Sequence, residues 1–294
     1  MNPSQLSRPF KYYGGMIFLL LRLSLTPLAV LASTVAQRRF GHAISGLIVG
    51  LPLTSLPILW LIANQHGAAF AETMTAALLV GSVAEAAVLW LYAHLTTRLS
   101  PTCALGAAVI AFALAAISLN LLGLSPVLAA ALTAAGFAVA LRWWPAPDPV
   151  APRASDRSRL GLRVLVAATL TFVIMALAGR LGPVWSGLLD ALPAMSMMMA
   201  FMTHQDDGAQ ASAGFLRGVT RGSFSYVAAM LVLAELLHSA TLLLAFGGAL
   251  GAALLVQAVL HIFDRLVIAR EISRTRALSP STPTPFLGDL ACCS

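Results

Sequence analysis

Long apolar runs are the feature that most constrains the fold of this chain. Residues 104–119 contain no charged side chain, and other runs are nearly as apolar. Because about 20 such residues form a helix that can cross the hydrocarbon core of a bilayer, the pattern predicts membrane-spanning helices. Only 10% of the residues are charged, whereas a soluble domain has about 25%. We therefore expect an all-α, polytopic membrane protein whose first partner is the lipid bilayer.

Charged residues, prolines, glycines and asparagines divide the apolar sequence into about nine expected transmembrane helices. Their predicted bounds are 16–36, 43–63, 68–95, 102–122, 126–144, 161–179, 183–203, 209–237 and 241–263. The stretch 143–159 combines prolines with arginines and aspartates. Such a composition predicts an exposed linker after the fifth span.

Basic residues near the ends of the spans predict the orientation of the chain. With nine spans, one side collects Arg38, Arg39, Arg98, Arg142, Arg153, Arg157, Arg159, Arg265, Arg270, Arg274 and Arg276. The other side collects only Arg8, Lys11 and Arg180. Since basic loops stay in the cytoplasm, we expect a multi-pass protein of the cell inner (plasma) membrane with a cytoplasmic C-terminus. The net charge of +7 has this origin, and without a reader motif we expect no nucleic-acid partner.

The most specific pattern is a gapless self-match at an offset of 141 residues, as from Gly41 to Gly182. It pairs Arg22 with Arg163, Pro52 with Pro193, Ser55 with Ser196, Gly67 with Gly208, Gly81 with Gly222 and Ser82 with Ser223. Matched Arg, Pro and Gly residues in one register are hard to obtain by chance. Spans one to four therefore correspond to spans six to nine, and the unpaired fifth span reverses the second unit. The result is an inverted 4+1+4 repeat, a recurrent plan of secondary transporters.

The expected organisation follows from this repeat. The first four-span repeat covers residues 1–122, and the connecting span with its linker covers residues 123–160. The second, inverted repeat covers residues 161–264. The remainder, 265–294, is predicted to be a cytoplasmic disordered tail, because its end is rich in Pro, Ser and Thr.

Two blocks of the sequence, 40–95 and 181–236, share a pattern of short motifs. In the first block these are Gly46-Leu47, Pro52, Gly67 and Gly81-Ser82, followed by a long apolar helix. The pattern resembles the GlpM family of small four-span membrane proteins, and the resemblance covers both four-span units but neither the fifth span nor the tail. If those small proteins pair antiparallel, this chain resembles their fused form; a homodimer is a further expected assembly. The family's link to alginate production implies a role in envelope polysaccharide assembly.

Two prolines interrupt equivalent spans. Pro52 and Pro193 each remove a backbone donor, which frees the carbonyl four residues earlier, that of Ile48 or Leu189. Interruptions at matching positions of two repeats indicate a transporter site near the bilayer midplane. The alternative is a structural kink that neighbouring helices shield.

Two acidic residues lie deep in predicted spans. Asp190 is in the seventh span, where an ionisable residue costs about 2.5–3.5 kcal/mol and usually faces the bundle interior. Ser186, Asp190 and Pro193 share one face of a continuous helix. Glu85 is the deepest acidic residue of the third span. We expect these groups to contact substrate or carry coupling protons; a buried ion pair is the alternative for Asp190.

Two arginines, Arg217 and Arg221, are four residues apart in the eighth span and therefore share a face. Guanidinium groups match the geometry of carboxylates and phosphates, so they favour an anionic substrate. In the alternative interpretation, Arg217 extends to the membrane surface and Arg221 pairs with Asp190.

Glycines recur every four residues in three of the predicted spans. Gly214, Gly218 and Gly222 form such a stripe in the eighth span, and shorter ones are formed by Gly46 with Gly50 in the second and Gly247 with Gly251 in the ninth. Stripes of this kind let helices approach closely, so we expect them at helix–helix interfaces.

Catalytic residues, metal ligands and cofactors are not expected. The run that includes His204, Asp206 and Asp207 is interpreted as a solvated turn, and Glu235 with His238 lacks the carboxylates of a di-metal site. The sequence therefore favours a secondary transporter or flippase, not an enzyme. Its expected substrate is an anionic small molecule or lipid-linked headgroup, with transport coupled to protons. The alternative is a non-transporting membrane scaffold or accessory protein for envelope polysaccharide assembly.

Overall fold

The computed structural model describes residues 31–145 and 182–278, together with Leu28, Leu165 and Thr169. This part of the chain is helical and contains no strand. Its helices are α2 (His42–Val49), α3 (Ser55–His66), α4 (Ala68–Leu95), α5 (Pro101–Leu121), α6 (Pro126–Arg142), α8 (Ala194–Asp207), α9 (Ala209–Leu236) and α10 (Leu242–Leu278). A further helical segment, 182–190, precedes α8.

Among the described residues, several helical segments are long and apolar enough to cross a membrane. They are Ala68–Leu95, Pro101–Leu121, Gly182–Asp207, Ala209–Leu236 and Leu242–Phe263. Outward-facing side chains of α5 and α10 are also apolar, since Leu114 and Leu254 are 64% and 63% exposed. Lipid is the environment that suits such surfaces. The predicted all-helical class is confirmed for the described residues, and the length and composition of these helices are compatible with a membrane protein.

The predicted spans agree closely with most helices. The span 68–95 coincides with α4, and the spans predicted for α6 and α9 differ from the observed bounds by no more than two residues. These boundaries were predictable because Gly, Pro and charged residues flank each apolar run. Most of the predicted spans 16–36 and 161–179, and most of the linker, lie outside the described residues, although residues 31–36 are described and helical.

Serine and proline set the start of two neighbouring helices. The hydroxyl of Ser100 accepts a hydrogen bond from the backbone N–H of Cys103 at the start of α5. Ser125 caps α6 in the same way through Leu128, at 3.3 Å. In both helices the next residue is proline, whose fixed φ suits the first helical position and whose missing N–H is not needed there.

The predicted spans 43–63 and 183–203 are broken helices instead of continuous ones. The first is divided into α2 and α3 between Gly50 and Thr54, and the second between residue 190 and the start of α8. The helical face expected for Ser186, Asp190 and Pro193 is therefore wrong, because Pro193 is the N-cap of a new helix.

The backbone of the two breaks forms the same hydrogen bonds at the same offset. The N–H of Leu51 donates to Ile48, and that of Leu192 donates to Leu189, at 3.3 and 3.2 Å. The carbonyls of Ile48 and Leu189 are thus occupied, contrary to the prediction that the prolines free them. The chain satisfies them by a tighter, three-residue turn, which is a usual way to end a helix. Pro193 is the N-cap of α8, and Pro52 lies two residues before Thr54, the N-cap of α3.

Two glycines join consecutive helices at equivalent positions. Gly67 connects α3 with α4, and Gly208 connects α8 with α9. Their φ angles are +90° and +95°, with extended ψ of 162° and 176°. Residues with a Cβ atom avoid this region, which is essentially restricted to glycine.

We expect Gly67→Ala and Gly208→Ala each to destabilise the protein by about 1–3 kcal/mol, because alanine is strained at these angles. Thermal unfolding in detergent measures the effect. Gly251→Ala is the control, because a Cβ there meets no atom within 4 Å. Equal melting temperatures for all three variants would show that the turns tolerate alanine.

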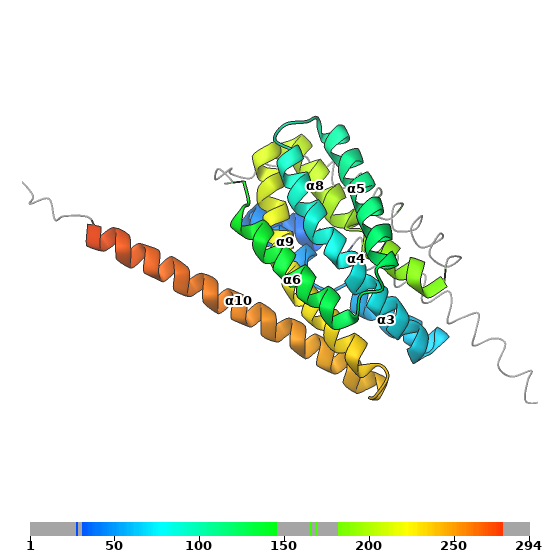
Figure 1. The fold of residues 1–294 in the computed structure, drawn as a ribbon. Coiled ribbons are helices and arrows are strands. Elements are labelled where there is room, and N and C mark those ends of the chain that lie inside the picture. The colour runs from blue at the N-terminus through cyan, green and yellow to red at the C-terminus, as the bar shows by residue number, and fades with distance from the viewer. Residues whose placement is uncertain (1–27, 29–30, 146–164, 166–168, 170–181, 279–294) are drawn as a thin grey trace, which may run out of the picture. The chain divides into compact units, whose positions relative to one another are not determined.

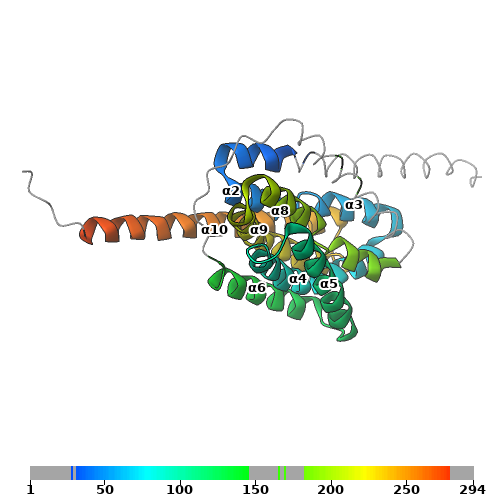
Figure 2. The same cartoon turned by 90° about the horizontal axis from the view of Figure 1, so that it is seen from above.

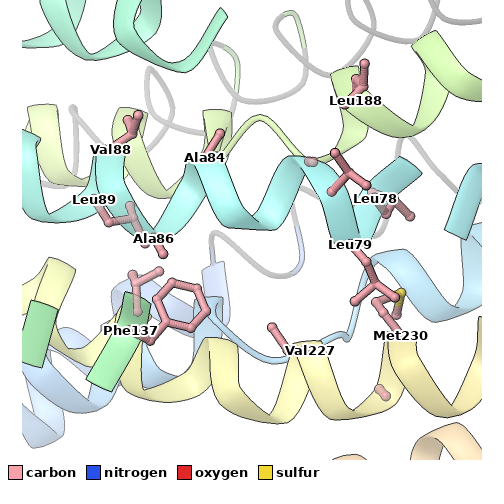
Figure 3. Packing of buried hydrophobic residues seen from close by; sticks show 14 of the residues in the cluster. Leu78, Leu79, Ala84, Ala86, Val88, Leu89, Phe137, Leu188, Val227 and Met230 are labelled. Carbon is pink, nitrogen blue, oxygen red and sulfur yellow. The ribbon is translucent and has the colours of Figure 1, made fainter. Parts of the chain in front are cut away.

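The core is formed between α4 and α9, with α6 packed against both (Figure 1). Leu79 of α4 and Met230 of α9 face each other, and Phe137 of α6 enters the same layer (Figure 3). All three are completely buried. Seen from above, α2 and α6 lie on opposite sides of α9 (Figure 2). The long helices of the two halves thus form the centre, and the connecting helix α6 covers both.

Glycines bring short helices into backbone contact with the long ones. A Cβ at Gly46 in α2 would overlap the carbonyl of Phe215 and crowd the N–H of Val219 in α9. Gly218 and Gly222 of α9 meet the backbone of α2 in turn. The predicted packing role is confirmed for Gly46, Gly218 and Gly222, but not for Gly247 and Gly251 of α10, where a Cβ would meet no atom within 4 Å. Such close approach permits Cα–H···O contacts between helices.

The same contact recurs at equivalent residues. Gly187, the counterpart of Gly46, lies against the backbone of Met74 and Leu78 in α4. Those two residues are the counterparts of Phe215 and Val219 at the offset of 141 residues. Each short helix therefore packs on the long helix of the other half. The two contacts are reciprocal, as expected for halves related by a two-fold exchange.

The last helix is longer than the predicted span. The chain divides into units Met1–Gln257 and Ala258–Ser294, and α10 continues through the second unit to Leu278. The region 265–278, predicted as the start of a disordered tail, is thus helical in the structure. Its sequence contains strong helix formers and no proline or glycine, which lets the helix continue beyond the apolar run. Residues 279–294 lie outside the described residues.

Candidate functional site

A small polar pocket of about 80 Å³ lies where the two helix breaks come together. Its lining residues are Val49, Gly50, Leu51, Thr54, Ser55, Glu85, Asp190, Ala191, Leu192, Pro193, Ser223 and Tyr226. The first five extend from the last residue of α2 to the first residue of α3, and residues 190–193 extend from the end of the segment 182–190 to the N-cap of α8. The long helices α4 and α9 contribute Glu85, Ser223 and Tyr226.

Both acidic residues singled out from the sequence line this pocket. Glu85 is only 9% exposed, and the hydroxyl of Ser223 donates a hydrogen bond to its carboxyl group. Asp190 ends the helical segment 182–190 and is half-buried. Carboxyl groups buried in membrane helices are typical of proton relays and cation sites. The pocket thus joins two such groups from different halves of the chain.

Hydroxyl groups complete the polar lining. Tyr226 lies close enough to Glu85 and Asp190 to interact electrostatically with both, and its hydroxyl is hydrogen-bonded with Ser55. Thr54 supplies a further hydroxyl beside Ser55. Hydroxyls can both donate and accept, so they can bind a proton carrier, a water molecule or a cationic group.

Four of these lining residues were missed by the sequence reasoning: Thr54, Ser55, Ser223 and Tyr226. A tyrosine in an apolar helix is usually interpreted as a core residue. The repeat offset contained the missing signal, because it places Tyr226 at the position equivalent to Glu85. Glu85 and Tyr226 both line the pocket. So do Val49 and Asp190, which are also equivalent at the repeat offset.

Other predicted site residues lie elsewhere. Arg217 and Arg221 are half-buried on α9, and neither is among the described residues that line the pocket. Ser186 lies about one helical turn before the break, and its hydroxyl donates a hydrogen bond to the carbonyl of Gly182 at 2.6 Å. Pro52 lines an adjacent apolar groove. Only Glu85, Asp190 and Pro193 of the predicted set meet in one place.

A second polar cluster ties the start of α2 to the end of α8. The Nε2 atom of His42 lies 3.8 Å from the Oδ2 atom of Asp207, and both side chains are buried. The amide nitrogen of Gln37 is 2.9 Å from Nδ1 of His42 and donates to Asp207 at 3.3 Å. Thr203 accepts a longer hydrogen bond from the same amide, at 3.5 Å. The cluster joins the two halves of the chain.

This cluster corrects the interpretation of Asp207 as part of a solvated turn. His204, Asp206 and Asp207 belong to the last turn of α8, which ends at Gly208. Asp207 faces His42 instead of a metal. Among the described residues, no group of three or more His, Cys, Asp or Glu side chains could hold a metal ion.

Glu235 and His238 lie at the opposite end of α9. They line a pocket of about 340 Å³ together with Glu72 and Thr73 of α4. Glu235 and His238 are both exposed.

Comparisons with family models, with curated proteins and with solved structures find no match for this chain. The resemblance to the GlpM family stays a prediction, and the functional proposals below depend on the residues and their geometry.

Proposed function

We propose that this chain is a secondary transporter or flippase of the inner membrane, with Glu85 and Asp190 as its coupling groups. The observation that carries the proposal is the polar pocket at the meeting point of two broken helices. Broken helices at equivalent positions of two repeats are where secondary transporters place their substrate and ion sites. In this proposal the chain is an inverted 4+1+4 repeat with its C-terminus in the cytoplasm.

The packing of the two halves supports this architecture. α2 packs on α9, and the equivalent segment 182–190 packs on α4 through the equivalent glycine. The pocket lies between these two contacts and is lined by residues of both. A site shared by two similar halves can be exposed to either side of the membrane when one half rocks against the other.

The lining of the pocket favours a proton, a cation or a hydroxylated group as its ligand. Two carboxyl groups and several hydroxyls face a small volume, and the lining contains no cationic side chain among the described residues. The anionic substrate suggested by Arg217 and Arg221 therefore has no support from this site. Electrostatic attraction between carboxylates and cations is strong in a buried pocket, because little water screens it.

Substrate-driven proton flux tests the proposal. Purified full-length protein is reconstituted in liposomes that enclose a pH-sensitive dye, and solutes and lipids are screened for a pH change. We expect Glu85→Gln and Asp190→Asn each to lower the coupled flux by at least about tenfold, because a lost hydrogen bond to a charged group has an effect of this order.

Glu72→Gln is the matched control, because it makes the same chemical change on α4 outside the polar pocket. Coupled flux that is unchanged in both pocket variants would show that the assigned site is wrong. A protein that transports nothing but copurifies with a stable partner in mild detergent would favour the scaffold role.

A further inference from the structure

An apolar groove of about 360 Å³ lies beside the polar pocket, between α3 and the first part of α10. It is lined by Leu51, Pro52, Leu53, Leu56, Pro57, Trp60, Phe246, Leu250, Ala253, Leu254 and Gln257. Trp60 and Phe246 close one end in an edge-to-face contact, with ring centroids 5.0 Å apart. The volume is within the range of ligand sites, about 300–1,000 Å³.

The groove and the pocket lie on two sides of the first helix break and share a lining residue. Leu51 lines both of them. Within the break, Pro52 and Leu53 belong to the groove, whereas Thr54 belongs to the pocket. Leu53 is 50% exposed on the groove side. The break, residues 50–54, thus separates an apolar groove from a polar pocket.

We propose that the site takes an amphipathic substrate, a lipid whose headgroup carries an ammonium group. The hydrocarbon chain lies in the groove and the ammonium group enters the pocket beside Glu85 and Asp190. This inference rests on the proposed function and names the substrate class of that site. Charge complementarity selects the headgroup, since the pocket is lined by two carboxyl groups, those of Glu85 and Asp190, and by hydroxyls, with no cationic side chain among its described lining residues.

The structure also offers a groove for comparison. A larger apolar groove, of about 670 Å³, lies between α4 and α6 and includes Trp90, Gly136 and Trp143. None of its lining residues lines the polar pocket. Ordinary bilayer lipid occupies both grooves, but only the groove beside the helix break can retain a lipid by its headgroup.

Photolabelling tests the proposal without a known natural substrate. The full-length protein is reconstituted in phosphatidylglycerol liposomes with a few per cent of phosphatidylethanolamine that carries a diazirine in its acyl chain. After illumination, labelled peptides are identified by mass spectrometry. We expect labelling in the groove of Leu250 and Leu254 to exceed labelling in the groove of Trp90 and Trp143 by about tenfold, the effect of one charge-assisted hydrogen bond.

The same probe with its amine acetylated has the same chain and phosphate but no ammonium group. We expect it to label the two grooves equally, and we expect Glu85→Gln to abolish the preference for the authentic probe. The acetylated probe requires no substitution, so a misfolded variant cannot obscure the result. Equal labelling of both grooves by both probes would overturn the proposal and identify bulk lipid as the only occupant.

The two proposals can fail separately. Coupled flux of a water-soluble solute that depends on Glu85, without headgroup-dependent labelling, would retain the transporter and overturn the lipid substrate. Headgroup-dependent labelling in a protein that moves no lipid or solute would retain the lipid site and overturn transport.

Discussion

Gly46→Ala and Gly218→Ala are expected to be the most destabilising single-methyl changes in the described part of the chain. A Cβ at Gly46 would overlap the carbonyl oxygen of Phe215, and one at Gly218 would overlap that of Ala43. The obstructing atoms are backbone, so no side chain can rotate away and α2 must separate from α9. Overpacking of this kind costs about 3 kcal/mol or more, which lowers the melting temperature by roughly 10 °C.

Gly106→Ala and Gly247→Ala are the matched controls, because a Cβ at either position meets no atom within 4 Å. Gly106 lies in α5 and Gly247 at the equivalent position of α10, so the two controls are also a pair of equivalent residues. The double variant of Gly46 and Gly218 should cost less than the sum of the single changes, since one separation of the helices relieves both overlaps. Melting temperatures equal to the controls would show that α2 and α9 do not touch in solution.

The positions of most helices could be predicted from the sequence, and their breaks could not. The bounds of α4 follow from Gly67 before an apolar run and polar residues after it, and the structure has the same bounds. Pro52 predicted a disturbance inside the second span, but proline alone does not distinguish a kink from a full break. At the break, Gly50 meets the backbone of α9, and such a contact between distant parts of the chain is not visible in the local sequence.

The two acidic residues of the candidate site could be predicted from the sequence, but their meeting in one pocket could not. Glu85 and Asp190 were conspicuous because ionisable groups are rare in apolar spans. Nothing local indicated that they share a pocket, since they belong to different halves of the chain. Tyr226 was not distinguishable from a core aromatic by periodicity. Arg217 and Arg221 have equally unusual positions for charged residues, yet neither lines the pocket. Their side chains project from a different side of α9 than that of Ser223.

The repeat also explains what differs between the halves. At the offset of 141 residues, the counterpart of His42 is Pro183 and the counterpart of Asp207 is His66. Proline has no side chain that can pair with histidine. The buried cluster of His42 and Asp207 is therefore specific to one end of the interface between the halves, where it holds α2 against α8.

We expect Asp207→Ala to destabilise the protein by removing a buried polar contact between the two halves. The substitution leaves the Nε2 atom of His42 and the amide of Gln37 without their carboxylate partner in a buried site. A buried polar group that loses its partner costs about 1–3 kcal/mol, and a buried charge costs more. Thermal unfolding of the full-length protein in detergent measures the loss. Gln205→Ala is the control, because Gln205 is exposed in the same helical turn.

A double-mutant cycle separates the pair from the general effect of truncating α8. If His42 and Asp207 act together, His42→Ala should add little to Asp207→Ala, with a coupling energy of about 1–3 kcal/mol. Effects that add within about 0.5 kcal/mol would show that the two side chains contribute independently. A real coupling would mean that the interface between the halves is fixed at this end by a polar contact. His42 begins α2 and Asp207 ends α8, and the other end of each helix borders the polar pocket. Movement of one half against the other would then have to separate His42 from Asp207.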